Sequence, residues 1–201
     1  MQQAILPSSS FSTPRGRIFL TGFMGSGKST IGPILANTLG YDFADIDRAV
    51  ETAAGRTVNE IFLGPGEEHF RTLERAALAE LGRRDRIVIS LGGGTLADGE
   101  SCRLVTGSGI LVYLRSSPEH LYRRVYRRED RPLLMDREGR RLSDEDLRRR
   151  IGELHELRAP LYERADITVD TEGRPVGISV DEIVRLLAPF LRSGRGLLPP
   201  A

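Results

Sequence analysis

The chain has 201 residues, a length that fits one ordinary globular domain. Hydrophobic residues make up 39% of it and charged residues 28%, a balance that excludes an intrinsically disordered protein. The formal net charge of +1 provides no overall attraction to nucleic acid or to an anionic membrane surface, so we expect neither as a partner.

The two ends of the chain differ in composition from the rest. The first residues, "MQQAILPSSSFSTP", lack the basic start of a secretory signal, and we expect residues 1–14 and 193–201 to be flexible tails. No apolar run reaches the roughly 18 residues that a membrane span requires. The single cysteine, Cys102, excludes an internal disulfide framework and suits a reducing cytosol. We therefore expect one cytoplasmic domain over residues 15–192.

Strand-like runs alternate with helical patterns along this domain. Strands are predicted over 17–21, 41–45, 86–91, 110–114 and 166–170. Helices are predicted over 28–39, 47–54, 57–63, 66–82, 97–105, 118–127, 143–163 and 177–191. Near-continuous apolar strands separated by helices indicate a parallel sheet that is covered on both faces. The fold class is therefore predicted to be α/β, a three-layer sandwich around a five-stranded parallel sheet.

A glycine-rich loop follows the first strand. In "GFMGSGKSTIG", Gly22, Gly27, Lys28 and Ser29 complete the pattern G-x-x-x-x-G-K-[ST] between a strand and a helix. In this motif backbone N–H groups and the helix N-terminus face phosphates, the lysine reaches the β- and γ-phosphates, and the Ser29 hydroxyl binds Mg²⁺. The motif predicts ATP-binding residues at Gly25, Ser26, Gly27, Lys28, Ser29 and Thr30.

The second strand ends in a pair of aspartates. Many P-loop proteins place an aspartate after a later apolar strand, but here "RIVIS" ends in Ser90. Asp45 and Asp47 are the best available carboxylates for a metal and a substrate. The alternative is that Asp47 only caps the helix that starts there.

The third strand is followed by a second glycine-rich loop, "LGGGTLA". Gly92, Gly94 and Ala97 satisfy the dinucleotide-binding pattern G-x-G-x-x-A, and Arg115 after the next strand could suit a 2′-phosphate. The pattern lies on the third strand, however, and the first βα turn already holds a more specific nucleotide motif. We therefore expect this loop to have another role.

Residues 129–141, "EDRPLLMDREGRR", are highly charged and show no helical or strand period. The simplest interpretation is a solvated charged surface. Nucleic-acid binding is a weaker one, because acidic residues interrupt the run and no aromatic stacking pattern accompanies it. A third interpretation is a mobile lid that carries an arginine to the phosphates.

Six segments in this order resemble the shikimate kinase family. They are "GFMGSGKSTIG", "DFADID", "FRTLE", "SLGGG", "RPLL" and "RAPLY", and the resemblance runs from about Arg17 to Leu191. It implies a P-loop kinase of the nucleoside-monophosphate-kinase type that uses MgATP to phosphorylate the 3-hydroxyl of shikimate. We expect a monomer. A gluconate kinase, also a P-loop enzyme, is the main alternative, and a phosphate-binding regulatory protein without turnover is another.

The resemblance also implies roles for the acidic and glycine residues. Asp45 resembles the acidic partner of the magnesium site. Asp47 resembles the carboxylate that holds the shikimate hydroxyls and is a candidate acceptor for the proton of the attacking one. Glu74 is similar to a supporting acid near the substrate, and Gly92, Gly93 and Gly94 to a loop whose backbone lies against it.

Arginines complete the implied site. Arg71 in "FRTLE" and Arg158 in "RAPLY" resemble a pair that binds the substrate carboxylate, which suits the planar, bidentate guanidinium group. From the residues alone, both could be ordinary helix-surface cations. Arg131 resembles the lid arginine that reaches the transferring phosphates, so Lys28, Asp47 and Arg131 are the predicted catalytic residues. The adenine contacts are poorly matched: the candidates are Arg174 with Pro175, and Arg124 in competition with Arg123 and Arg127.

Overall fold

The computed structural model describes residues 16–126, 140 and 142–193. The predicted tails lie outside the described residues, apart from Ser193. The predicted lid also lies outside them, except for Arg140, and so do its Arg131 and the adenine candidate Arg127.

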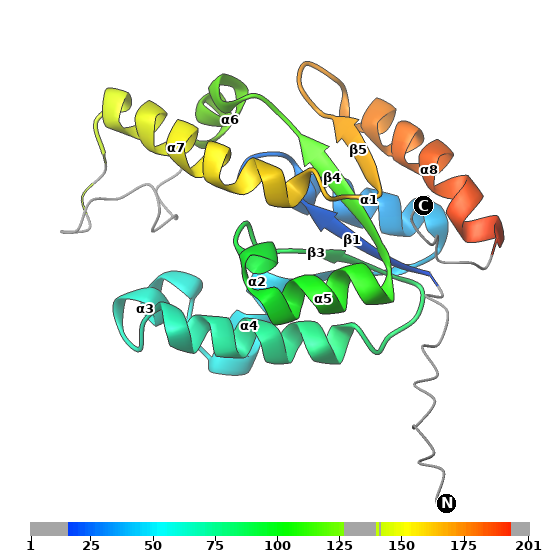
Figure 1. The fold of residues 1–201 in the computed structure, drawn as a ribbon, viewed down its shortest axis with the longest axis horizontal. Helices are drawn as coiled ribbons and strands as arrows, with labels where there is room; N and C mark the ends of the chain where they lie inside the picture. The colour runs from blue at the N-terminus through cyan, green and yellow to red at the C-terminus, as the bar shows by residue number, and fades with distance from the viewer. Residues whose placement is uncertain (1–15, 127–139, 141, 194–201) are drawn as a thin grey trace, which may run out of the picture.

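Five parallel strands form the central sheet (Figure 1). They are β1 (Arg17–Thr21), β2 (Asp42–Asp45), β3 (Ile87–Ser90), β4 (Ile110–Arg115) and β5 (Ile167–Asp170). Their order in the sheet is β2-β3-β1-β4-β5. The predicted α/β fold and its five parallel strands are thus confirmed.

Helices connect each strand to the next. They are α1 (Lys28–Leu39), α2 (Ile46–Ala54), α3 (Val58–Leu63), α4 (Glu67–Leu81), α5 (Gly99–Ser108), α6 (Pro118–Val125), α7 (Asp144–Tyr162) and α8 (Val176–Ser193), with a 3₁₀ turn, η1, at Thr95–Ala97. The largest difference from the prediction is α5, which was expected over 97–105. Its start is set by Asp98, whose carboxylate accepts hydrogen bonds from the backbone N–H of Ser101 at 2.9 Å and from its hydroxyl at 2.8 Å.

Alternate residues of the strands pack into two separate cores. On one face of the sheet, Ile18 and Leu20 of β1 pack with residues of α1 and α8. On the opposite face, Phe19 packs with residues of the helices from α2 to α7. Because both faces are covered, the sheet lies between two helical layers (Figure 1). This is the predicted three-layer sandwich.

The topology creates a crevice at the carboxyl ends of β1 and β3. The central strand β1 pairs with β3 on one side and with β4 on the other, so the chain crosses from one half of the sheet to the other between β3 and β4. Loops that leave neighbouring strands at such a switch point diverge and leave room for a ligand. Both glycine-rich loops of the sequence start here.

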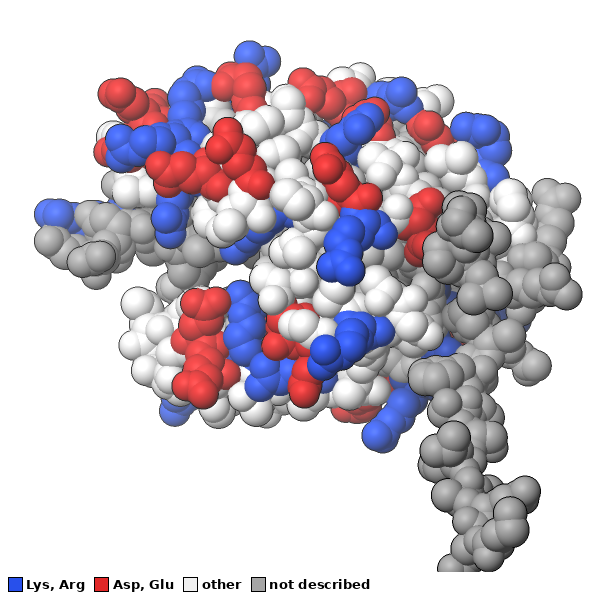
Figure 2. All heavy atoms as spheres, viewed as in Figure 1, with Lys and Arg blue, Asp and Glu red and all other residues white. Residues whose placement is uncertain are grey.

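Acidic and basic side chains are interspersed on the face of the molecule that Figure 2 shows. This agrees with the small net charge. Among the described residues, none of the helices combines the length and the apolar character that crossing a membrane requires.

Candidate active site

The loop after β1 is shaped to present its backbone to an anion. Gly22 adopts φ 140° and Gly27 φ 104°, and a Cβ added at Gly22 would lie 2.7 Å from the carbonyl oxygen of Leu114. Helix α1 begins directly after Gly27, and no side chain caps its first turn. A helix start of this kind can present backbone N–H groups to a phosphate, which is the role that the motif predicts for this loop.

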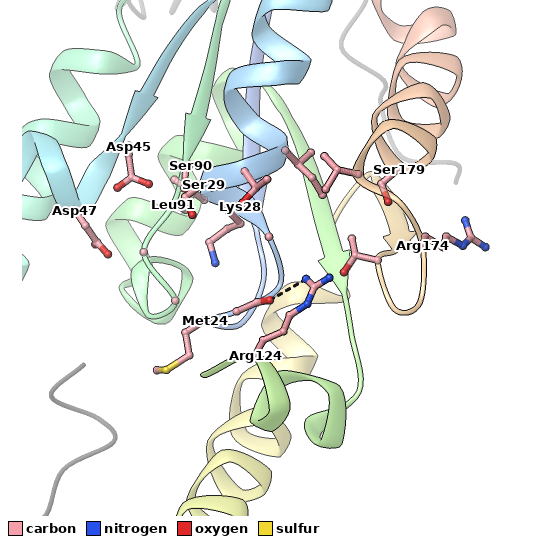
Figure 3. A pocket seen from close by; sticks show the side chains of 18 residues that line it. Met24, Lys28, Ser29, Asp45, Asp47, Ser90, Leu91, Arg124, Arg174 and Ser179 are labelled. Carbon is pink, nitrogen blue, oxygen red and sulfur yellow. Dashed lines mark hydrogen bonds between the residues drawn. The ribbon is translucent and has the colours of Figure 1, made fainter. Parts of the chain in front are cut away.

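Lys28 folds back over the same loop. Its Nζ donates hydrogen bonds to the carbonyl oxygens of Gly22 at 2.6 Å and of Phe23 at 3.2 Å. In Figure 3, Asp45 and Asp47 lie on one side of Lys28, while Arg124 and Arg174 lie on the other. The ammonium group is thus held where the phosphate chain of a nucleotide would pass.

A cavity of about 280 Å³ extends along this loop. It brings together residues that are far apart in the sequence: Gly25, Gly27, Lys28, Ser29, Thr30, Asp45, Asp47, Gly92, Gly93, Arg124, Thr171, Arg174, Val176 and Ser179. Both predicted metal residues, Ser29 and Asp45, lie on its wall. Ser26 belongs to the same loop but does not line the cavity and is buried.

The two aspartates have different local roles. Asp45 pairs in register with Ser90 and caps α2, accepting a hydrogen bond from the backbone N–H of Arg48 at 3.3 Å. The helix cap that was considered for Asp47 is therefore provided by Asp45, and Asp47 lies in the first turn of α2. Asp47 faces the second glycine loop, with its Oδ1 3.1 Å from the Cβ position of Gly92.

Each glycine of the second loop is approached by a different part of the site. A Cβ at Gly92 would lie 2.7 Å from Oε1 of Glu74, one at Gly93 would lie 3.1 Å from Nη1 of Arg158, and one at Gly94 would lie 2.6 Å from Nη2 of Arg71. Side chains at these positions would displace the very groups that approach them. The loop thus brings both predicted arginines to one place, although Arg71 and Arg158 come from α4 and α7.

Arg71 is held by two carboxylates. Its Nη1 donates to Oε2 of Glu74 at 2.7 Å and its Nη2 to Oε1 of Glu67 at 3.0 Å. Glu74 is 1% exposed and also accepts a 2.6 Å hydrogen bond from the Thr95 hydroxyl. Burial alone would lower the pKa of Arg71, but the charges and hydrogen bonds of Glu74 and Glu67 outweigh it and raise that pKa. Glu74 therefore fixes the direction of the Arg71 guanidinium.

Arg158 lies beside the second glycine loop and next to the ring of Phe23. Its guanidinium carbon is 5.9 Å from the centre of the Phe23 ring. Tyr162, one helical turn later, donates a 2.6 Å hydrogen bond from its hydroxyl to the carbonyl oxygen of Gly93. Arg158 and Tyr162, the first and last residues of "RAPLY", thus both contact the site from the C-terminal end of α7.

A smaller cavity of about 90 Å³ adjoins the first and contains these groups. Its polar wall is formed by Asp47, Arg71, Glu74, Arg158 and the three glycines. Its apolar wall was not anticipated from the sequence and consists of Met24, Val58, Phe62 and Phe70. A pocket wall and a core share the same helical period, so periodicity does not distinguish the two.

Two of the adenine candidates, Arg124 and Arg174, line the far end of the larger cavity. Arg124 lines the cavity and donates a 3.1 Å hydrogen bond to the carbonyl oxygen of Gly25 (Figure 3), whereas Arg123 pairs with Glu119 at 3.1 Å. Arg174 also lines the cavity and pairs with Glu182, while Pro175 is not among the lining residues. Thr171, Val176 and Ser179 complete this end and were not anticipated.

The alternative role of the second glycine loop is not supported. Arg115, the candidate for a 2′-phosphate, forms two 2.7 Å hydrogen bonds with Asp170 instead. Side-chain groups of Glu74, Arg158 and Arg71 approach the Cβ positions of the three glycines, where the dinucleotide-binding motif would place a pyrophosphate.

Comparison with known proteins agrees with this geometry. The family model described as "Shikimate kinase" matches residues 24–188. The shikimate kinase of Chlorobaculum tepidum is 47% identical over 175 residues, which cover 87% of this chain and 92% of the relative. That of Chlorobium limicola is also 47% identical over 175 residues, covering 87% and 88%.

Solved structures give the same result. A shikimate kinase from Acinetobacter baumannii in complex with shikimate superposes with a TM-score of 0.80 at 34% identity, covering 92% of this chain and 98% of that one. A gluconokinase from Sinorhizobium meliloti, at a TM-score of 0.51 and 21% identity over 90% and 95% of the two chains, shares the fold alone. The chain therefore belongs to the shikimate kinase family, the ATP-dependent phosphotransferases that act in the shikimate pathway of aromatic amino acid biosynthesis.

Proposed function

We propose that the chain transfers the γ-phosphoryl group of MgATP to the 3-hydroxyl of shikimate, with the nucleotide in the larger cavity and shikimate in the smaller one. The observation that carries this proposal is the loop Gly92–Gly94, where Asp47, Arg158 and Arg71 converge from three helices. Shikimate is a small carboxylate with ring hydroxyls. Around this loop, Arg71 and Arg158 offer cations for the carboxylate, and Asp47 offers an acceptor for a hydroxyl. The A. baumannii relative, which is in complex with shikimate, supports the choice of ligand.

The nucleotide side uses backbone groups and a lysine for the phosphates. The backbone of Gly25 and of Gly27 to Thr30 lines the cavity and faces the phosphates, and Lys28 reaches the β- and γ-phosphates once its contacts with the loop carbonyls are exchanged for phosphate oxygens. Arg124 and Arg174 lie at the end of the cavity where the adenine would sit. Arg124 is held there by Gly25, so its planar guanidinium is available to stack on the base.

The residues present fit a magnesium ion. Mg²⁺ is usually bound by one or two carboxylates or hydroxyls, substrate phosphates and water, so a cluster of three or more acidic or histidine ligands is not expected. No such cluster occurs among the described residues. Ser29 and Asp45 line one cavity at the start of α1 and the end of β2 and would hold the ion, which neutralises charge on the phosphates when bound.

The substrate side uses side chains. Arg71 and Arg158 bind the shikimate carboxylate, and Glu74 acts through Arg71 by fixing its orientation. Exposed Glu67 is the partner that Arg71 can release when the substrate carboxylate arrives. Phe62, Phe70 and Val58 pack against the apolar side of the ring.

Asp47 lies between the two cavities and lines both. A carboxylate here accepts a hydrogen bond from the 3-hydroxyl and aligns its oxygen for in-line attack on the γ-phosphorus. As the new P–O bond forms, the hydroxyl proton passes to Asp47 and the bond to the β,γ-bridging oxygen breaks, releasing ADP. Transfer of this kind depends mainly on positioning and charge stabilisation.

Three further expectations complete the proposal. Arg131 reaches the transferring phosphates from a lid over 129–141, although it lies outside the described residues. We also propose that the protein acts as a monomer and that it acts in the cytoplasm. The single cysteine, Cys102, suits a reducing compartment and supports the cytoplasm.

A coupled ADP-release assay tests the proposed reaction. Turnover is expected with shikimate and MgATP, and only slow ADP release with gluconate or without an acceptor. Product analysis by phosphorus NMR should then place the phosphate on the 3-hydroxyl. ADP release that is equally fast without shikimate would contradict the proposal and indicate a plain ATPase.

A further inference from the structure

Tyr162 lies beside Gly93, with its hydroxyl 3.7 Å from the Cβ position of that glycine, and it lines neither cavity. It is the last residue of α7 and is 1% exposed. Its hydroxyl donates a 2.6 Å hydrogen bond to the carbonyl oxygen of Gly93, which is 69 residues away in the sequence. The contact thus joins α7, which carries Arg158, to the glycine loop, whose Gly92 and Gly93 line both cavities.

Three consecutive glycines have more backbone freedom than any other tripeptide, so this loop needs an external constraint to keep one conformation. A peptide unit is rigid and planar, with its C=O and N–H pointing in opposite directions. Holding the Gly93 carbonyl against Tyr162 therefore turns the N–H of Gly94 away from Tyr162. The same contact keeps Gly93 and Gly94 at the positions where Arg158 and Arg71 approach them.

Tyr162 is also coupled to Arg158, which precedes it by one turn of α7. Burial raises the pKa of Tyr162 to about 12, against the opposing charge and hydrogen bond of Arg158. The hydroxyl therefore keeps its proton and remains a donor throughout the neutral pH range. Its ring packs on that of Tyr113, with ring centres 5.3 Å apart.

We propose that Tyr162 is a positioning residue for shikimate, which fixes the glycine loop through the Gly93 carbonyl and thereby sets the geometry of the substrate cavity. The inference rests on the proposed function, because it assumes that this cavity is the shikimate site. Tyr162 acts on the substrate only through the loop and Arg158. Its effect should therefore appear in shikimate binding and alignment and not in nucleotide binding.

The variant Tyr162→Phe removes only the hydroxyl, and Tyr113→Phe is a matched control. Tyr113 is also buried in the same cluster, and among the described hydrogen bonds none joins its hydroxyl to the glycine loop. We expect Tyr162→Phe to lower kcat/KM for shikimate about tenfold, while the Kd for ADP changes less than about twofold. Tyr113→Phe should leave both values within about twofold of the wild type.

Equal shikimate affinity in the two tyrosine variants would overturn the proposal, and so would an equal loss of shikimate and ADP binding in Tyr162→Phe. If that variant does not fold, a crystal structure of the wild type with shikimate decides: a Tyr162 hydroxyl within hydrogen-bonding distance of the Gly93 carbonyl oxygen supports the anchor, and the absence of this contact refutes it. Normal shikimate binding in Tyr162→Phe, together with lost binding when Arg158 is replaced, would refute this inference while leaving the proposed function intact.

Discussion

The nucleotide side and the substrate side of this site are built by different means. The loop after β1 presents backbone N–H groups at a helix start, and its shape depends on glycines with positive φ. The substrate side presents charged side chains around glycines that are needed for space, since groups of Glu74, Arg158 and Arg71 lie where their Cβ atoms would be. A phosphate chain can thus be bound by a local motif, whereas a hydroxylated carboxylate requires residues assembled from several helices.

The largest effect is expected at Lys28, the cation of the phosphate loop. Lys28→Met should reduce kcat/KM on the order of 10²-fold or more, because charge stabilisation at the transferring phosphate is lost. Shikimate affinity should stay close to that of the wild type, since Lys28 does not line the smaller cavity. A folded variant with near-normal turnover would contradict the role of the loop.

The next largest effect is expected at the two arginines of the substrate side, and it should change the affinity for shikimate without changing that for MgATP. Arg71→Lys and Arg158→Lys each keep the positive charge but lose the planar fork, and we expect shikimate affinity to fall roughly 10- to 100-fold. The affinity for MgATP should barely change, because neither arginine lines the larger cavity. Titration of each variant with both ligands measures the difference. If shikimate bound normally to both variants, the substrate assignment would fail while the ATP site would stand.

Thr171 offers a smaller effect on the nucleotide side. Its buried hydroxyl lies 3.1 Å from the carbonyl oxygen of Ser26 and 3.1 Å from that of Arg115. This hydroxyl therefore links the phosphate loop to the end of β4. Thr171→Val should weaken MgATP binding about three- to tenfold, and Thr171→Ser should restore it. Shikimate binding is the control. Weaker binding of both ligands to the valine variant would indicate general destabilisation instead of a local support.

The smallest effect concerns the outer partner of Arg71. Glu67 is 64% exposed and forms a 3.0 Å ion pair, which is screened by solvent. Glu67→Gln should change the Kd for shikimate by less than about threefold, toward tighter binding, because Arg71 loses a competitor. A loss of more than about tenfold, measured by the same titration, would mean that Glu67 holds Arg71 in place or contacts the substrate itself.

The sequence was most informative where the determinants are local. The apolar strands and their order along the chain predicted the sheet, and the glycines and lysine of "GFMGSGKSTIG" predicted the phosphate loop, because each depends on neighbouring residues. Both arginines were named in advance, but only through the family resemblance. From the residues alone, ordinary surface cations were the favoured interpretation.

What could not be predicted depends on contacts between distant segments. Tyr162 and Thr171 form hydrogen bonds with loops that lie 69 and 145 residues away in the sequence. Neither residue type indicates such a contact. Phe62 and Phe70 were not anticipated as pocket residues, because a pocket wall and a core share the same helical period. Arg124 could be distinguished from Arg123 only in the structure, since neighbouring helix positions point about 100° apart and face different surroundings.

The most direct test of the account is a crystal structure of the chain with ADP, Mg²⁺ and shikimate. The account predicts the phosphates of ADP along the loop Gly22–Thr30, the shikimate carboxylate between Arg71 and Arg158, and the 3-hydroxyl within hydrogen-bonding distance of Asp47. Shikimate bound in this cavity with its carboxylate turned away from both arginines, or bound elsewhere on the protein, would contradict the account.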